Sequence, residues 1–204
     1  MTASVLQELA RSDKILARLI RKVGPCTLIP KNHRSPFQAL VQSVAYQQLN
    51  GAAAGTIFKR FKALYPGRRF PRPEDVLATP DELMRKAGLS RAKTAAIKDI
   101  ASKTLEGIVP TSGSIVNMTD AEILERLTTV RGVGPWTVEM LLIFTLGRPD
   151  VLPATDYGVR KGFALTYGLK SLPEPKQLLA HGERWRPHRS TAAWYFWRAL
   201  ELPT

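Results

Sequence analysis

The chain contains 204 residues, of which 44% are hydrophobic, enough to bury the core of one large domain or of two small lobes. Its 30 Lys and Arg residues against 17 Asp and Glu give a formal net charge of +13, which favours a polyanionic partner, DNA or RNA, with a solubilising basic surface as the alternative. The single cysteine, Cys26, excludes an intrachain disulfide and a four-cysteine iron–sulfur or zinc site.

In the first half of the chain, apolar residues recur at helical spacing between residues that typically cap or end helices. The expected helix starts are Ser12, Ser35, Asn50, Thr79 and Ser90, and the expected ends are Gly24, Tyr65, Gly88 and Glu106. Runs that alternate apolar and polar residues, as strands do, are nearly absent. The sequence therefore predicts an all-α fold.

The second half contains the most informative stretch, a predicted helix, a glycine hairpin and a second helix. Thr119 and Glu122 form a capping box, so the first helix is expected over 120–127. Pro135 suits the first position of the next helix, which is expected to end at Gly147. Further helices are predicted after Thr155, from Pro175, and after Pro187.

The hairpin between these helices predicts an anion site. Gly132 and Gly134 allow backbone angles that other residues disfavour, so the chain can reverse there within a few residues. Backbone N–H groups then point outward at the start of a helix, where they attract anions. On a basic chain the expected anion is a DNA phosphate. Further basic residues cluster at 68–72, 91–98 and 184–189.

Several other classes of protein are not expected. No window approaches the length of a membrane span, and the N-terminus lacks the basic-then-apolar pattern of a signal peptide. His33, His181 and His188 are not at the spacing of metal ligands. We therefore expect no membrane association, no required cofactor and a cytoplasmic location, next to the nucleoid if the partner is DNA.

Four segments carry a specific resemblance. They are Phe37–Gln48, the hairpin Val130–Trp136, the aspartate loop Leu152–Arg160 and Glu183–Ser190. In this order they resemble the helix-hairpin-helix superfamily of DNA glycosylases, most closely its 3-methyladenine DNA glycosylase II (AlkA-type) branch. Such hairpins occur in many DNA-binding proteins, but the hairpin, the spaced aspartate and the Trp-Arg-Pro segment together are specific.

The resemblance implies two helical lobes with the active site in a cleft between them. One lobe would combine residues 1–35 with 151–204. The other would be residues 36–150, with the helix-hairpin-helix motif at about 119–147. The implied partner is double-stranded DNA containing damaged bases, and the implied state is a monomer.

Asp156 is the candidate catalytic residue. Breaking an N-glycosidic bond develops positive charge on the sugar, which a fixed carboxylate stabilises while it orients or deprotonates the attacking water. Thr155 is expected to cap the following helix and to place Asp156 in its first turn, where the helix dipole favours negative charge. The alternative is that Asp156 is only a capping carboxylate.

Trp136 stands where lyase members of the superfamily carry a nucleophilic lysine, so the resemblance implies a monofunctional enzyme that uses water and leaves an abasic site. The indole would form an aromatic wall for a flipped, cationic alkylated base, such as 3-methyladenine or 7-methylguanine. A hydrophobic plug for the hairpin is the alternative. Trp197, Tyr157 and Met140 match or adjoin further pocket positions, with Trp197 alternatively a core aromatic. Met140 removes one stacking face and leaves the substrate range open.

The DNA contacts implied by the resemblance lie in two turns. A wedge that fills the gap left by the flipped base would be Gln48 or Leu49, unless this is only a polar turn between helices. Arg131, Gly132, Gly134 and Pro135 would contact the DNA backbone, together with the N–H of Trp136. The carbonyls of Thr128, Val130 and Val133 would hold a structural Na⁺ or K⁺ that bridges to a phosphate.

Two other functions stay open. A non-catalytic helix-hairpin-helix DNA-binding module would share the charge and the glycines, and a bifunctional glycosylase/lyase would act on oxidised bases. The sequence does not distinguish among alkylated, deaminated and etheno bases as the preferred lesion.

Overall fold

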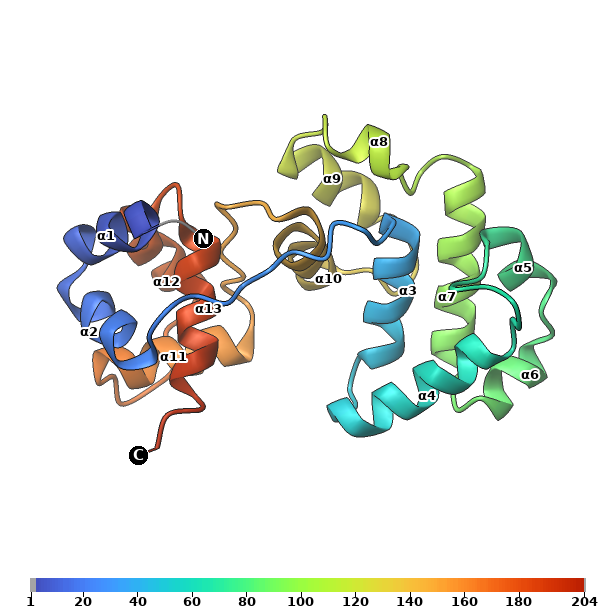
Figure 1. The fold of residues 1–204 in the computed structure, drawn as a ribbon, viewed down its shortest axis with the longest axis horizontal. Coiled ribbons are helices and arrows are strands. Elements are labelled where there is room, and N and C mark those ends of the chain that lie inside the picture. The colour runs from blue at the N-terminus through green and yellow to red at the C-terminus, as the bar shows by residue number, and fades with distance from the viewer. Residues whose placement is uncertain (1–2, 204) are drawn as a thin grey trace. The chain divides into compact units, whose positions relative to one another are not determined.

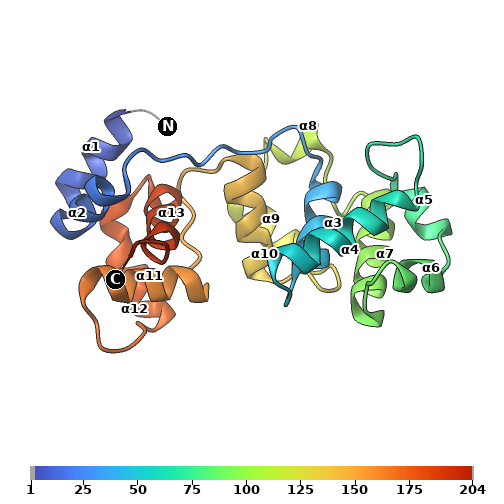
Figure 2. The same ribbon diagram turned by 60° about the horizontal axis from the view of Figure 1, so that its bottom comes forward.

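A computed structural model describes residues 3–203, and helices are the only regular elements among these residues. The predicted all-α class is confirmed. The chain forms two compact units (Figures 1 and 2). One unit is continuous, Lys31–Leu141, and the other combines Met1–Pro30 with Leu142–Thr204. The boundaries predicted from the sequence lie later in the chain, after residues 35 and 150. No helix among the described residues is long and apolar enough to cross a membrane.

The discontinuous unit contains helices from both ends of the chain. They are α1 (Ala3–Ser12), α2 (Lys14–Val23), the π-helix η1 (Leu142–Leu146), α11 (Tyr157–Tyr167), α12 (Pro175–Gly182), the 3₁₀ helix η2 (Glu183–Trp185) and α13 (Arg189–Ala199). Helix α13 packs against α11 and α2, and all three contribute to one core (Figure 1). Trp185, Tyr195 and Phe196 are fully buried there. At Gly162 a methyl group would lie 1.9 Å from the Phe196 carbonyl oxygen, so α11 and α13 touch through their backbones.

Asp13 ties this unit together. Its Oδ1 accepts the N–H groups of Ile15 and Leu16 and so caps α2. Its Oδ2 accepts hydrogen bonds from the hydroxyl of Tyr167 and from Trp185 Nε1. The prediction that Ser12 caps this helix was wrong. Ser12 ends α1, and the carboxylate of the next residue, Asp13, accepts the N–H groups at the start of α2. Helix α1 itself had no predicted counterpart.

The continuous unit is built around one long helix. Its elements are α3 (Pro36–Tyr46), α4 (Gly51–Ala63), α5 (Pro73–Ala78), α6 (Asp81–Lys86), α7 (Arg91–Leu105), α8 (Ser112–Ile115), α9 (Asp120–Leu127) and α10 (Pro135–Leu141). Helix α7 contacts α3, α5 and α6, while α10 contacts α3 and α9 (Figure 2). The rings of Phe37, Phe58, Phe61 and Phe70 form an aromatic cluster in this unit.

Most predicted caps are confirmed, but the predicted start at Thr79 was wrong, because Thr79 ends α5 and the next helix begins after Pro80. The side chains of Ser35, Asn50 and Ser90 each accept a backbone N–H from the first turn of their helix. Thr119 and Glu122 form the reciprocal capping box. The predicted helix from Pro135 to Gly147 is continuous, but its last turn widens into the π-helix η1 before Gly147 ends it at φ +70°.

Candidate functional site

The hairpin between α9 and α10 has the predicted tight turn, but its two glycines do different things. Gly132 has φ +77°, and a methyl group there would lie 2.8 Å from the Cβ of Ala96 on α7. It is needed both for the turn and for close packing. Gly134 is not among the described residues with positive φ, and a methyl group there would meet nothing within 4 Å. The prediction that both glycines supply unusual backbone angles was therefore wrong for Gly134.

The outer face of the hairpin is accessible. Arg131, Gly132 and Pro135 are exposed, and Gly134 is half-buried. The N–H of Arg131 donates a 2.8 Å hydrogen bond to Asp99 Oδ2, so this amide is used inside the protein. The N–H of Val133 is likewise used, since it donates to the Val130 carbonyl. The guanidinium of Arg131 and the N–H groups of Gly132 and Gly134 are the groups that suit an anion.

Three hairpin carbonyls were predicted to hold a monovalent cation. Those of Thr128, Val130 and Val133 are neutral oxygen donors, which suit Na⁺ or K⁺. The Val130 carbonyl accepts the N–H of Val133 at 3.1 Å and retains its second lone pair. The donor set therefore fits such an ion.

The turn between α3 and α4 is strained at the position expected for the wedge. Gln48 has φ +56°, the only positive φ of a non-glycine residue among those described, and its side chain is exposed. Leu49 is 40% exposed, and Asn50 then caps α4 through the N–H of Ala53. Both wedge candidates therefore lie at the tip of a short turn with fixed ends.

Trp136 and Met140 lie on α10, in the continuous unit. They are four residues apart and so share one face of the helix. Trp136 is 39% exposed, which is unusual for an indole, while Met140 is half-buried. An exposed indole at the start of a helix argues against the alternative that Trp136 plugs the hairpin.

Asp156 lies in the discontinuous unit, at the start of α11. Contrary to the prediction, Asp156 is itself the N-cap and Thr155 is not. Its Oδ1 accepts the N–H of Val159 at 2.7 Å and Nε1 of Trp197 at 2.8 Å. The carboxylate is therefore fixed from two sides, by the helix that it caps and by an indole from α13. Its capping role is real and explains why it is held so firmly.

The surroundings of Trp197 show how it reaches the carboxylate. Gly158 faces it, and a methyl group there would lie 2.9 Å from Trp197 Cδ1 and 3.1 Å from Asp156 Oδ1. The ring of Phe144 also packs against the indole, with ring centroids 5.4 Å apart. Trp197 is half-buried and also packs against the core of this unit, so the alternative of a core aromatic stays open. Tyr157 is 62% exposed, with the ammonium of Lys161 5.9 Å from its ring centroid.

The Trp-Arg-Pro segment and the start of α13 hold the chain that leads to Asp156. Arg189 Nε donates to Asp150 Oδ1 at 2.7 Å, and Arg186 binds the same carboxylate. Ser190 Oγ accepts the N–H of Val151 and donates to the Arg148 carbonyl. The basic cluster at 184–189 is thus engaged within the protein, as are Arg68 and Arg72 with Asp75. The feature of the sequence that could have indicated these internal ion pairs is Asp150, which lies just before the aspartate loop.

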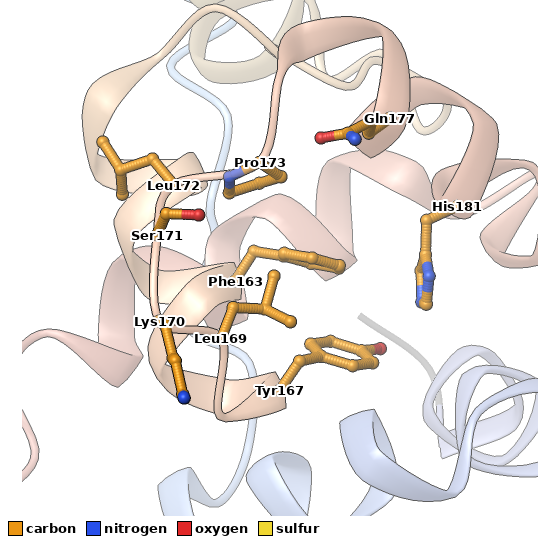
Figure 3. A pocket seen from close by; sticks show the side chains of 9 residues that line it. All are labelled: Phe163, Tyr167, Leu169, Lys170, Ser171, Leu172, Pro173, Gln177 and His181. Atoms are coloured by element: carbon orange, nitrogen blue, oxygen red, sulfur yellow. The ribbon is translucent and has the colours of Figure 1, made fainter.

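A pocket of about 480 Å³ lies elsewhere in this unit, between α11 and α12 (Figure 3). Phe163 and Tyr167 from α11 and His181 from α12 line it, with residues of the connecting loop. None of the catalytic, substrate-binding or DNA-binding residues predicted from the sequence lines this pocket. His181 also packs edge-on against both aromatic rings, as expected for a packing residue. No group of three His, Cys, Asp or Glu side chains in the described part of the chain could hold a metal ion.

Comparisons with known proteins identify relatives over almost the whole chain. The model of the HhH-GPD superfamily base excision DNA repair proteins matches residues 41–187. DNA-3-methyladenine glycosylase 1 of Schizosaccharomyces pombe is 39% identical, over 97% of this chain and 86% of its own length. An alkylbase DNA glycosidase-like protein of the same organism is 32% identical, over 96% and 92%. The solved structure of the S. pombe 3-methyladenine DNA glycosylase in complex with abasic DNA superposes with a TM-score of 0.90 at 37% identity, over 98% of both chains.

Proposed function

Because the chain belongs to the HhH-GPD superfamily of base excision DNA repair proteins, we propose that it is a monofunctional DNA glycosylase that removes alkylated bases, such as 3-methyladenine and 7-methylguanine. The observation that carries the proposal is the Asp156 carboxylate, which Val159 and Trp197 hold in one orientation. The relatives named for action on 3-methyladenine supply the substrate class.

Asp156 stabilises the transition state. As the damaged base leaves, the sugar gains oxocarbenium character, and a fixed carboxylate stabilises this charge without having to reorganise. The same group orients or deprotonates the water that attacks the sugar. The products are the free base and an abasic site. Hydrogen bonds to Oδ1 restrict the rotation of the carboxylate, which favours a single productive geometry.

Trp136 excludes the lyase reaction and favours cationic bases. Lyase members of the superfamily attack the sugar with a lysine at this position, and an indole has no nucleophilic amine. Methylation of a ring nitrogen makes a purine cationic, which strengthens its stacking on the electron-rich indole. Such bases also leave readily, so modest catalysis is sufficient. Met140, on the same face of α10, adapts its shape to different bases.

The partner is double-stranded DNA. The hairpin residues Arg131, Gly132, Gly134 and Pro135 contact the phosphate backbone, and the carbonyls of Thr128, Val130 and Val133 hold a monovalent cation beside it. Gln48 or Leu49 fills the gap left by the flipped base. Support comes from the net charge of +13 and from the exposed tips of both turns. We further propose that the protein works as a monomer, in the cytoplasm with the nucleoid.

The test is a base-release assay on defined duplexes. Purified protein is mixed with duplexes carrying 3-methyladenine, 7-methylguanine, etheno, deaminated or oxidised bases, and abasic sites are detected by alkaline cleavage. We expect release of the alkylated purines, and no strand cleavage before alkali. Borohydride should trap no covalent adduct. Binding without release on every duplex would favour the non-catalytic module, and a trapped adduct would favour the lyase.

A further inference from the structure

Two turns that are far apart in the sequence are joined by a single side chain in the continuous unit. Gln47 immediately precedes the strained Gln48 at the tip of the α3–α4 turn. Its Nε2 donates to the Gly132 carbonyl of the hairpin at 3.1 Å and to Thr137 Oγ1 of α10 at 3.3 Å. The Gly132 carbonyl is not among the three proposed to hold a cation, so this contact does not compete with that site.

Lys93, on α7, also holds the α3–α4 turn in place. Its ammonium donates to the carbonyls of Ala45 at 2.9 Å and Gln47 at 2.7 Å, at the end of α3. A cation is favourable there because the last carbonyls of a helix carry partial negative charge. Burial lowers the pKa of the Lys93 ammonium, which is consistent with its enclosed position.

One face of α7 connects both turns. Lys93, Ala96 and Asp99 are spaced three residues apart and so lie along one side of the helix. Lys93 holds the α3–α4 turn, while Ala96 lies under Gly132 and Asp99 accepts the N–H of Arg131. The α3–α4 turn, the hairpin and α7 therefore each contact the other two. The side chain of Gln47 is the direct link between the two turns.

We propose that Gln47 and Lys93 are positioning residues that hold the wedge at a fixed distance from the phosphate-binding hairpin. The proposal rests on the function proposed above, and it adds a specific step. The hairpin binds the DNA backbone, and the wedge must enter the base stack at a fixed distance from the bound phosphate. A turn that is already ordered loses no conformational freedom when the base flips. Without these contacts, the wedge must be ordered during each flipping event.

The test compares two substrates that differ in the cost of flipping. One duplex carries the alkylated base in a full pair, and the other carries the same base unpaired in a bulge, where extrusion costs less. On the paired substrate we expect Gln47→Ala and Lys93→Met each to slow single-turnover release about tenfold, the effect of losing one or two hydrogen bonds. On the bulged substrate we expect a rate close to that of the original protein, and unchanged binding to undamaged duplex.

Matched controls are Gln42→Ala on α3 and Lys103→Met on α7, for which we expect no change on either substrate. Fluorescence of 2-aminopurine beside the lesion reports flipping directly, and thermal unfolding checks that each variant is folded. If either variant unfolds, two other substitutions carry the test. Gln47→Glu keeps the size of the side chain but places an acceptor against the Gly132 carbonyl. Lys93→Arg keeps the charge and should restore the rate.

Equal loss on paired and bulged substrates, or no loss on either, would overturn the positioning role. An original protein that releases the base from neither substrate would instead contradict the proposed function. The two failures are therefore distinguishable in one experiment.

Discussion

The indole Nε1 of Trp197 donates a 2.8 Å hydrogen bond to Oδ1 of Asp156, the same oxygen that accepts the N–H of Val159. A residue predicted as a pocket aromatic, or alternatively as a core aromatic, is thus also a hydrogen-bond donor to the proposed catalytic carboxylate. This contact joins α13 to the start of α11 and makes the orientation of Asp156 depend on both helices.

Asp156→Asn should abolish base release while DNA binding survives. The amide oxygen can still cap α11 and accept from Trp197, so the fold is retained, but the negative charge beside the sugar is lost. We expect release to fall at least about a hundredfold, as when one electrostatic group is removed from an active site. Single-turnover release and duplex binding are measured together, and unchanged release would refute the mechanism.

Trp197→Phe should lower kcat more than it raises KM. Phenylalanine keeps a ring against Phe144 but lacks Nε1, so Asp156 loses the hydrogen bond from α13. We expect kcat to fall about tenfold, the effect of one lost hydrogen bond to a charged group. Trp194→Phe, on the same helix, is the matched control. An effect confined to KM would assign Trp197 a stacking role alone.

The two hairpin glycines should respond differently to alanine. Gly134→Ala adds a methyl group where nothing lies within 4 Å, so the fold is unaffected, but a phosphate can no longer approach the backbone closely. Gly132→Ala strains a residue at φ +77° and meets Ala96, so stability should fall by about 1–3 kcal/mol. Duplex affinity and urea unfolding separate the two. Unchanged DNA binding by Gly134→Ala would argue against phosphate contact at this residue.

Gly158→Ala should affect activity, and Gly162→Ala stability. A methyl group at Gly158 meets Trp197 and Asp156 Oδ1 at about 3 Å, so the indole must shift and release should slow. At Gly162 a methyl group would overlap the Phe196 carbonyl at 1.9 Å, and the backbones of α11 and α13 must separate. We expect the second variant to lose about 3 kcal/mol or more in thermal unfolding. Equal activity of Gly158→Ala and the original protein would contradict the proposed packing.

The stability of the protein should fall in two steps as the pH is lowered. Burial, followed by the charge of Arg184, lowers the pKa of His181, so the folded state disfavours its protonation and stability falls below about pH 6.5. Burial by itself would raise the pKa of Asp13, but hydrogen bonds from Tyr167, Leu16 and Trp185 outweigh it and lower the pKa. Its contribution is present above about pH 4 and is lost as the pH falls further.

Urea unfolding from pH 7.5 to 3 checks this assignment. His181→Gln should remove the upper step, and Asp13→Asn the lower one, together with about 1.5–3 kcal/mol of stability at neutral pH. A single step that neither variant changes would assign the pH dependence to other groups.

Helices were predictable where one residue type decides the local geometry. Ser35, Asn50 and Ser90 each stand alone as a good capping residue before an apolar helical pattern, and each caps its helix. Thr119 is followed by Asp120, but Glu122 completes a capping box with Thr119 and so decides between the two. Thr79, predicted to start a helix, instead ends α5. The two other misplaced caps, Ser12 and Thr155, share one cause. Each hydroxyl residue is followed by an aspartate, and both types are strong caps, so local sequence does not decide between them.

The candidate site was predictable only as separate residues. Asp156 and Trp197 could be named from the resemblance, but their hydrogen bond depends on how closely α13 approaches α11, which the space at Gly158 permits. Gln47 was not predicted at all, because its partner Gly132 lies 85 residues away and a polar residue in a turn has no distinctive pattern. Contacts of this kind arise from tertiary packing and leave no periodic signal in the sequence.

The discontinuous unit has a consequence for the order in which the protein can fold during synthesis. Leu16, Leu19 and Ile20 of α2 are made early, but the core that buries them needs α11 and α13. Asp13 meets Tyr167 only after a further 154 residues have been added. By then the whole of Lys31–Leu141 has been synthesised. The apolar residues of α1 and α2 that belong to this core therefore cannot be buried in it until α11 and α13 have been made.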